Sequence, residues 1–340
     1  MTSKLPAMKA APLSVPTDDE VRRALGAVLS EADAGEPLEI HRSRSEYRST
    51  FPLEDLRVTL AHGGSLRLAF KRLQRAGLSR QARLAKPSFL FDPAREPAVY
   101  RTVLPDAPAG PPRYLGCVAK GAGEAWLFVE WVEGRELYQV GDRALWVDVA
   151  RWLGDLHGSL ALGLERRVEQ ARLLEHDAAY YERWIARAKR FAQAAGASSD
   201  AARFLDGLAK RYDEIVQALL ALPRTLVHGD FFASNVLVAG AAGAARVAPV
   251  DWEMAAVGSG LTDLAALVSG DWTEAEREQM TAAYASRPGV APFSARELDL
   301  ARLQLAVQCL GWAPADWVVP EGHRHDWLAD AVTLAQRLGI

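Results

Sequence analysis

The chain has 340 residues, of which 49% are hydrophobic and 24% charged, and these are the proportions of an ordinary soluble globular protein with room for two lobes. A net charge of −3 gives no reason to expect a nucleic-acid-binding protein. Two cysteines cannot make a disulfide framework, no apolar run approaches the ~18 residues of a membrane span, and the N-terminus lacks the apolar stretch of a secretion signal. We therefore expect a cytoplasmic protein without membrane contact, in which residues 1–16 form a flexible tail.

Charge is unevenly distributed along the chain. Residues 1–100 carry 16 Lys and Arg against 12 Asp and Glu, whereas residues 251–340 carry 6 against 13. A basic first part suits an anionic nucleotide, and an acidic last part suits a cationic or polyhydroxylated partner.

The first 132 residues predict one helix followed by a mainly antiparallel sheet. Thr17 or Asp18 would cap a helix that ends near Ser30. Short alternating runs predict strands, and a His-Gly-Gly turn separates two of them. The expected strands are residues 38–40, 56–60, 66–70, 114–118 and 126–132, with a helix starting at Glu96 and a Pro-rich loop over 105–112.

After Gly134 the spacing of apolar residues becomes helical. Three helices are expected over residues 145–156, 181–188 and 204–219. Two later helices open with capping boxes, Thr273 with Glu276 and Ser294 with Glu297, and a last one covers residues 326–338. Strands first and helices later predict a two-lobed α+β protein with lobes at residues 17–132 and 133–340.

Between the helices lies the segment LVHGDFFASNVLV (226–238), and the sequence VDWE follows it. Asp230 precedes Asn235 by five residues, and Asp251 comes sixteen residues later. The flanking apolar runs predict short buried strands whose tips bring the three side chains together. Phosphoryl transfer needs a carboxylate that accepts a hydroxyl proton, together with an amide and a second carboxylate that hold Mg²⁺. The alternative, that these residues only form turns, does not explain their spacing.

The order HGDFFASN, VDWE and TDLA resembles the motifs of the aminoglycoside phosphotransferase and choline kinase superfamily, small-molecule kinases with a protein-kinase-like fold. The resemblance covers residues 40–270 and is tightest over 226–267. It implies that Asp230 is the catalytic base, that Asn235 and Asp251 are the Mg²⁺ ligands, and that Asp263 is structural. His228 would shape the loop.

The resemblance also implies nucleotide-binding residues in the first part of the chain. Lys71 ends a strand and is similar to the lysine that binds the α- and β-phosphates, while Glu96 is similar to its helix glutamate. A solvent-exposed strand end is the alternative for Lys71, and Arg72 is a rival for the phosphates. The segment FVEWVEG (128–134) resembles the hinge, where the Glu130 carbonyl and the Val132 amide would bind the base of ATP or GTP.

The expected nucleotide loop departs from the kinase pattern because residues 42–50 contain no glycine. Ser43 and Ser45, together with Arg44, would replace the missing phosphate contacts, and the alternative is a weak or altered nucleotide site. The loop also admits the alternative of a degenerate protein of the same fold that binds nucleotide without turning it over.

The predicted reaction is transfer of the γ-phosphoryl group of a nucleoside triphosphate, ATP or GTP, to a hydroxyl of a small molecule. Only the acidic C-terminal part favours an amino-sugar or aminoglycoside-like acceptor, and choline-like amines, amino acids such as homoserine, macrolides and plain sugars remain open. We expect His157 to be a packed or capping residue. The His-x-His-Asp segment (323–326) favours a loop that enters a helix over a metal site. The tryptophans of the last third are expected mostly in the core, although one or two could line an acceptor pocket.

Overall fold

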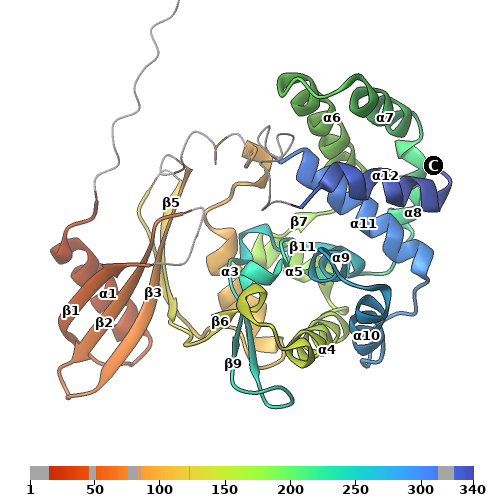
Figure 1. Cartoon of the computed structure of the whole chain (residues 1–340). Helices are drawn as coiled ribbons and strands as arrows, with labels where there is room; N and C mark the ends of the chain where they lie inside the picture. Colours follow the sequence, from red (N-terminus) through yellow and green to blue (C-terminus); the bar gives the residue numbers. More distant parts are fainter. Residues whose placement is uncertain are drawn as a thin grey trace, which may run out of the picture. The chain divides into compact units, whose positions relative to one another are not determined.

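A computed structural model of the chain describes residues 15–45, 51–75, 78, 83, 86–121, 123–312 and 325–340. Several predictions lie outside the described residues: most of the N-terminal tail, residues 46–50 of the expected nucleotide loop, Trp317 and His323. Within the described ranges, the helices and strands follow the predicted order (Figure 1).

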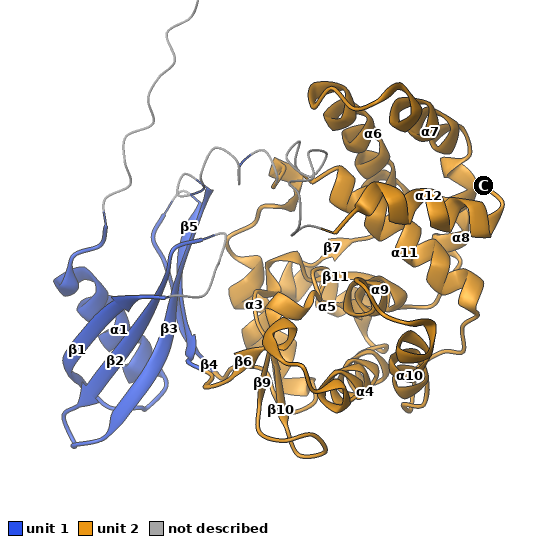
Figure 2. Cartoon of the chain, viewed as in Figure 1, with its two compact units in different colours: residues 1–83, 114–131 blue, residues 84–113, 132–340 orange. Residues whose placement is uncertain are grey.

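Contacts divide the chain into two compact units, residues 1–83 with 114–131 and residues 84–113 with 132–340 (Figure 2). The sequence predicted a division between residues 132 and 133, whereas the structure groups residues 84–113 with the second unit. Helix α3 (Arg95–Thr102) explains this grouping, because it packs against α5 (Leu164–Ala171) and against η6 (Trp252–Met254), both of the second unit.

The first unit is a five-stranded antiparallel sheet with the order β1-β2-β3-β5-β4. Neighbouring strands pair in register over most of their length, as between Lys71 and Leu127. The strands are β1 (Pro37–Arg44), β2 (Leu53–Leu60), β3 (Ser65–Gln74), β4 (Tyr114–Ala119) and β5 (Glu124–Glu130).

Helix α1 (Asp18–Glu31) covers this sheet, and Thr17 caps it through the expected capping interaction. The core between helix and sheet is apolar, with Phe70 stacked on Phe128 at 4.9 Å between ring centroids. Helix and sheet approach closely at Gly116, where a Cβ atom would lie 2.6 Å from a methyl carbon of Val28. Only glycine permits this distance.

The second unit is mainly helical and contains two small sheets. One has the order β10-β9-β6, and in the other β11 is antiparallel to β8 and parallel to β7. The strands are β6 (Arg135–Glu136), β7 (Leu174–Glu175), β8 (Arg224–Val227), β9 (Val236–Ala239), β10 (Arg246–Pro249) and β11 (Ala256–Ser259). The remaining helices are α4 (Arg143–Ser159), α6 (Ala178–Ala194), α7 (Ser199–Lys210), α8 (Tyr212–Leu220), α9 (Leu261–Leu267), α10 (Glu274–Ala285), α11 (Ala295–Leu310) and α12 (Trp327–Leu338).

Helix α11 is the central helix of this unit and contacts α6, α8, α9 and α12 (Figure 1). Buried residues occur on all of its faces, which is the pattern of a helix enclosed by others. Both predicted capping boxes are present, at the start of α10 and at the start of α11. An antiparallel unit followed by a mainly helical one confirms the predicted α+β class.

The expected helix over residues 204–219 is wrong in one respect, because the chain forms two helices there, α7 and α8. The break is at Arg211, whose φ of −111° and ψ of 7° are not helical. Apolar spacing continues through the break, from Leu208 to Tyr212 and on to Ile215, and all three are buried. Periodicity therefore cannot reveal it.

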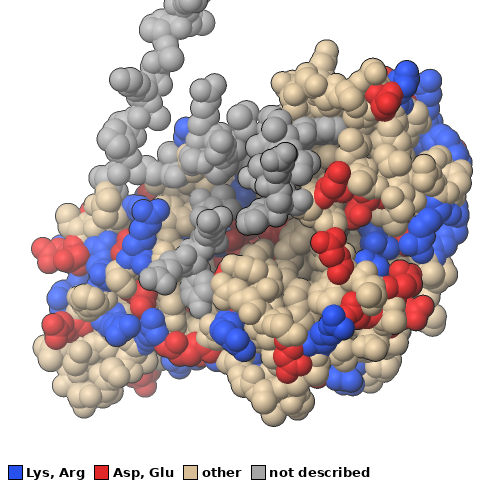
Figure 3. All heavy atoms as spheres, in the orientation of Figure 1, with Lys and Arg blue, Asp and Glu red and all other residues tan. Residues whose placement is uncertain are grey.

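No helix in the described ranges combines the length and the apolar content that a membrane span requires. On the face shown in Figure 3, acidic and basic side chains lie next to each other at many points. Ion pairs between exposed side chains include Arg203 with Asp200 and Lys189 with Asp206. Neither sign of charge dominates that face.

Candidate active site

Asp230 and Asn235 lie in one short segment between β8 and β9. The Asn235 side-chain nitrogen donates to the main-chain oxygen of Asp230 at 2.8 Å and to its carboxylate Oδ2 at 2.9 Å. These bonds use the amide nitrogen and not Oδ1, the oxygen that a metal ion would bind. The loop therefore holds the two side chains in contact in an arrangement compatible with metal binding.

The β9–β10 hairpin brings Asp251 to the same place. Val236 at the start of β9 pairs with Pro249 at the end of β10, so Asn235 and Asp251 flank the same end of the hairpin. The backbone N–H of Val250 donates to the Asn235 carbonyl at 2.9 Å. Strand β8, however, pairs with β11 in the other sheet, so residue 230 enters the site from a separate sheet.

Two unusual backbone conformations shape this region. Asp251 has a φ of 66°, a left-handed conformation that costs most L-residues roughly 1–2 kcal/mol and that Asp adopts more readily than most. Gly229 has a φ of +80°, and a Cβ atom there would lie 2.3 Å from the carbonyl oxygen of Met254. Backbone strain of this kind often marks functional sites.

His228 joins the two loops through both of its ring nitrogens. It is fully buried, and Nε2 lies 2.9 Å from the Val250 carbonyl oxygen. Nδ1 accepts the backbone N–H of Asp230 at 3.3 Å, which assigns the proton to Nε2 as donor to Val250. With both nitrogens engaged, His228 shapes the loop.

Asp263 supports the loop from helix α9. Its carboxylate accepts the backbone N–H groups of His228 and Gly229, at 2.6 and 2.9 Å. His157 Nε2 lies 3.2 Å from the same carboxylate, and His157 Nδ1 lies 2.9 Å from the hydroxyl of Tyr284. Burial alone would raise the pKa of Asp263, but the bonds from His157 and His228 hold it below its usual range. The carboxylate is therefore ionised and accepts all of these hydrogen bonds.

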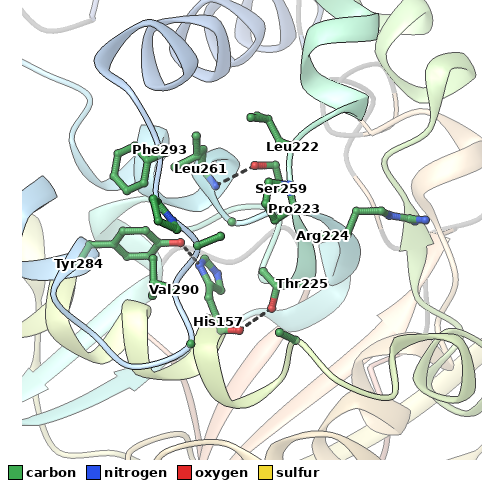
Figure 4. A pocket seen from close by; sticks show the side chains of 15 residues that line it. His157, Leu222, Pro223, Arg224, Thr225, Ser259, Leu261, Tyr284, Val290 and Phe293 are labelled. Carbon is green, nitrogen blue, oxygen red and sulfur yellow. Dashed lines mark hydrogen bonds between the residues drawn. The ribbon is translucent and has the colours of Figure 1, made fainter.

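A cavity of about 60 Å³ adjoins this chain of hydrogen bonds (Figure 4). His157, Tyr284 and Phe293 line it together with Ser259 and Leu261, and the Tyr284 hydroxyl points toward His157. Asp263 itself is 1% exposed. Tyr284, at one end of this series of hydrogen bonds, thus borders the cavity, while Asp263 at the other end is enclosed by protein.

Burial, and next the nearby Asp251 carboxylate, raise the pKa of Asp230 to about 6. The charge of Lys86 and the hydrogen bond from Asn235 act in the opposite direction. A cation bound beside Asp230 would lower its pKa again, because it favours the ionised carboxylate.

Two basic residues of the second unit contact the segment after Asp251. Lys86, which is 2% exposed, forms an ion pair with Oε1 of Glu253. Arg95 donates from Nη1 to the carbonyls of Leu90 and Glu253, at 2.8 and 2.7 Å. It also donates from Nε to the carbonyl of Arg172 at 2.7 Å. The start of α3 is thereby fixed to the loop that carries Asp251.

The predicted nucleotide-binding residues are divided between the two units. Lys71 lies in β3 and is 6% exposed, with Nζ 5.7 Å from the ring centroid of Phe51. Ser43 lies in β1. Ser45 directly follows the end of β1, and its backbone N–H donates to the Leu53 carbonyl at 3.0 Å. Glu130 ends β5 in the first unit. Glu96, 2% exposed in the first turn of α3, and Val132 belong to the second unit. The pairing of Lys71 with Glu96 stays a prediction.

The histidines and tryptophans outside the loop are mostly structural. His157 is packed, as expected. His325 Nε2 lies 2.6 Å from Oδ2 of Asp330, and no cluster of three metal-binding side chains occurs in the part of the chain that the structure describes. Trp252 is fully buried, whereas Trp327 lies 6.1 Å from the ring of Phe232, two residues after Asp230.

Sequence reasoning missed Lys86, Arg95 and the roles of His157 and Tyr284 as neighbours of Asp263. Lys86 stands in the segment AKPS, which matches no motif, and Arg95 is only the neighbour of the predicted Glu96. Tyr284 comes 127 residues after His157, and nothing in the local pattern links them. All these contacts arise from packing between distant segments.

Comparison with known proteins places the chain in a family. The sequence model of the phosphotransferase enzyme family, APH, matches residues 58–300. No protein with a curated description matches the sequence significantly. Similar solved structures include a GDP complex of an aminoglycoside 2′-phosphotransferase IIIa variant, with a TM-score of 0.57, 12% identity, and coverage of 93% of this chain and 96% of that one.

Two further structures come from named organisms. A macrolide 2′-phosphotransferase from Brachybacterium faecium has a TM-score of 0.55 and 18% identity, over 92% of this chain and 97% of that one. Choline kinase from Cryptosporidium parvum has a TM-score of 0.54 and 15% identity, over 88% of each chain. At these identities the likeness concerns the fold, and it confirms the predicted kinase-like fold. Since the family model spans well over half of the sequence, the chain belongs to the phosphotransferase enzyme family.

Proposed function

We propose that this enzyme transfers the γ-phosphoryl group of a nucleoside triphosphate, ATP or GTP, to a hydroxyl group of a small molecule. The observation that carries the proposal is the hydrogen bonding between the Asp230 loop and the segment that leads to Asp251. Asn235 binds Asp230 through its side chain and Val250 through its carbonyl oxygen, so that Asp251 directly follows a residue bonded to the loop of Asp230. A base and two oxygen ligands at one hairpin end fit phosphoryl transfer.

In the proposed reaction the acceptor hydroxyl donates a hydrogen bond to the Asp230 carboxylate. Its oxygen forms a bond to the γ-phosphorus while the bond from that phosphorus to the bridging oxygen breaks, and the nucleoside diphosphate leaves. The hydroxyl proton passes to Asp230. The bond from Asn235 uses Oδ2 of Asp230, so we assign the proton to Oδ1.

Asn235 and Asp251 would hold Mg²⁺, and their hard oxygen atoms suit this ion. Bound Mg²⁺ would supply positive charge to the phosphates. Lys71, Ser43 and Ser45 would bind phosphate oxygens, and Glu96 would orient Lys71. The backbone of Glu130 and Val132 would bind the base. GTP stays a candidate donor because a similar structure is a GDP complex.

For the acceptor we propose an amine-bearing alcohol, such as an amino-sugar or an aminoglycoside-like compound. The similar structures include an aminoglycoside phosphotransferase with kanamycin and a choline kinase. The hydrogen bond and charge of Asp330 and the charges of Asp271 and Asp326 raise the pKa of His325, two residues before Trp327, whose ring lies 6.1 Å from that of Phe232. This group of carboxylates would favour a cationic acceptor.

The nucleotide site is tested by thermal unfolding of the wild type and of Asp251→Ala, with and without Mg²⁺ and with ATP or GTP. A ligand at a hundredfold over its Kd stabilises the native state by about 2.7 kcal/mol. We expect a Mg²⁺-dependent increase of Tm in the wild type and its loss in the variant. Release of ADP or GDP in the presence of kanamycin or choline would then identify the acceptor class. A Mg²⁺-dependent shift without release of ADP or GDP would favour the degenerate, non-catalytic alternative, and no shift with either nucleotide would contradict the proposed nucleotide site.

A further inference from the structure

Lys86 is a buried cation among the carboxylates of the candidate site. Its side chain is 3% exposed, and its ammonium pairs with Glu253, two residues after Asp251. Its charge also acts on Asp230, where it opposes the effect of the Asp251 carboxylate. The ion pair with Glu253 places the ammonium beside the segment that begins with Asp251, the proposed Mg²⁺ ligand.

The segments that form the site carry no cation of their own. Residues 225–245, which include the Asp230 loop, contain no Lys or Arg, and neither do residues 251–276. Phosphoryl transfer nevertheless needs positive groups next to the transferred phosphoryl group, because negative charge spreads over its equatorial oxygens in the transition state. Beyond the charge of Mg²⁺, a positively charged side chain at this site therefore has to come from another segment.

Lys86 and Arg95 both contact Glu253 in the segment after Asp251, and they are engaged differently. Arg95 donates to three backbone carbonyls from three parts of the chain, so it is fixed in a structural position. Lys86 pairs with a side chain and has a flexible four-carbon stem. A buried ion pair is by itself weak evidence for stability, because desolvation offsets much of the attraction.

We propose that Lys86 is a further catalytic residue, whose ammonium rests on Glu253 in the free enzyme and contacts the γ-phosphoryl group during transfer. This inference rests on the proposed function. It assigns Lys86 to the terminal phosphate, at the Asp230 end, and leaves the α- and β-phosphates to Lys71. Lys86 thus compensates for the absence of a cation in the sequence HGDFFASN.

The test compares nucleotide binding by wild type and Lys86→Met, using Mg²⁺ with ADP and Mg²⁺ with a non-hydrolysable ATP analogue, or the guanine counterparts. We expect Lys86→Met to bind the diphosphate like the wild type and to lose roughly tenfold or more in affinity for the triphosphate analogue, as loss of a charge-assisted contact implies. We also expect kcat to fall by about 10²-fold. The surface variant Lys189→Met, which breaks the pair with Asp206, is the matched control and should change neither value.

Glu253→Gln separates this role from a structural one, since it breaks the same ion pair but leaves the ammonium in place. It should keep the preference for the triphosphate analogue. If Lys86→Met does not fold, the double variant Lys86→Met/Glu253→Gln removes both charges and carries the same binding test.

Equal loss of diphosphate and triphosphate binding in Lys86→Met, or full triphosphate preference in that variant, would overturn the assignment of Lys86 alone. Absence of nucleotide binding by the wild type would overturn the proposed function together with it.

Discussion

His157 on α4 and Asp263 on α9 form a buried hydrogen bond, with 3.2 Å between Nε2 and Oδ2. The same carboxylate accepts the backbone N–H groups of His228 and Gly229, the two residues before Asp230. The position of the proposed base therefore depends on two helices, α4 and α9, that are separate in sequence from its loop. The hydrogen bonds of this buried cluster are strong because one partner is charged.

Tyr284→Phe should weaken this support modestly. Because Nε2–H of His157 donates to the carboxylate, Nδ1 accepts the Tyr284 hydroxyl proton, and the variant leaves that buried acceptor without its donor. We expect the free energy of unfolding in urea to fall by about 1–2 kcal/mol. Tyr138→Phe, at a tyrosine that is 58% exposed, should leave it unchanged. Equal stability of Tyr284→Phe and wild type would mean that this hydrogen bond does not stabilise the fold.

His176 should make the protein sensitive to mild acid. Neither ring nitrogen has a hydrogen-bond partner among the described residues, and burial lowers the pKa of His176 to about 4. Below its unfolded pKa of roughly 6.5 the unfolded chain binds a proton that the folded protein does not bind, so stability falls as the pH drops from 6.5 toward 4.

The expected loss for His176 is about 3 kcal/mol between pH 7.5 and pH 4, as its pKa shift implies. Urea unfolding across this range should show that loss in the wild type in excess of His176→Gln, a polar variant of similar size that does not titrate. Parallel pH profiles for the two proteins would show that His176 is not responsible.

Gly229→Ala should destabilise the protein and disturb the site at once. The new methyl group would lie 2.3 Å from the Met254 carbonyl oxygen, and alanine at a φ of +80° adds roughly 1–2 kcal/mol of backbone strain. We expect a total cost above 2 kcal/mol in urea unfolding, together with lower turnover. Gly243→Ala is the control, since it has a similar positive φ of +83° and no atom within 4 Å. A cost no larger than that of the control would rule out the predicted clash.

Asp230→Asn should abolish base catalysis while it preserves the loop. The side-chain oxygen of an asparagine can still accept the hydrogen bond from Asn235, so nucleotide binding should persist. Turnover should fall by about 10²–10⁴-fold, which is the usual contribution of a positioned general base. Measurement of kcat alongside the nucleotide-induced Tm shift checks both parts. Undiminished turnover would remove Asp230 from the mechanism.

The sequence by itself determined the antiparallel strands of the first unit, several helices of the second, the α+β class and the family, but it did not predict α5, α9, β6, β7 or β11. Alternation for β2 and β3 and the capping boxes of α10 and α11 depend on neighbours within a few residues, where chain geometry fixes which side chains meet. The order and spacing of Asp230, Asn235 and Asp251 identified the family. The break at Arg211 was missed because apolar spacing continues across it.

Only the tertiary structure decided how the loop of Asp230 is held. The residues that are bonded to one another are far apart in sequence: Asp263 and His228 by 35 residues, His157 and Asp263 by 106, and Lys86 and Glu253 by 167. It also assigned residues 84–113 to the second unit. Contacts of this range leave no periodic trace in a single sequence, because they depend on how separate helices and strands pack and not on the backbone geometry of either segment.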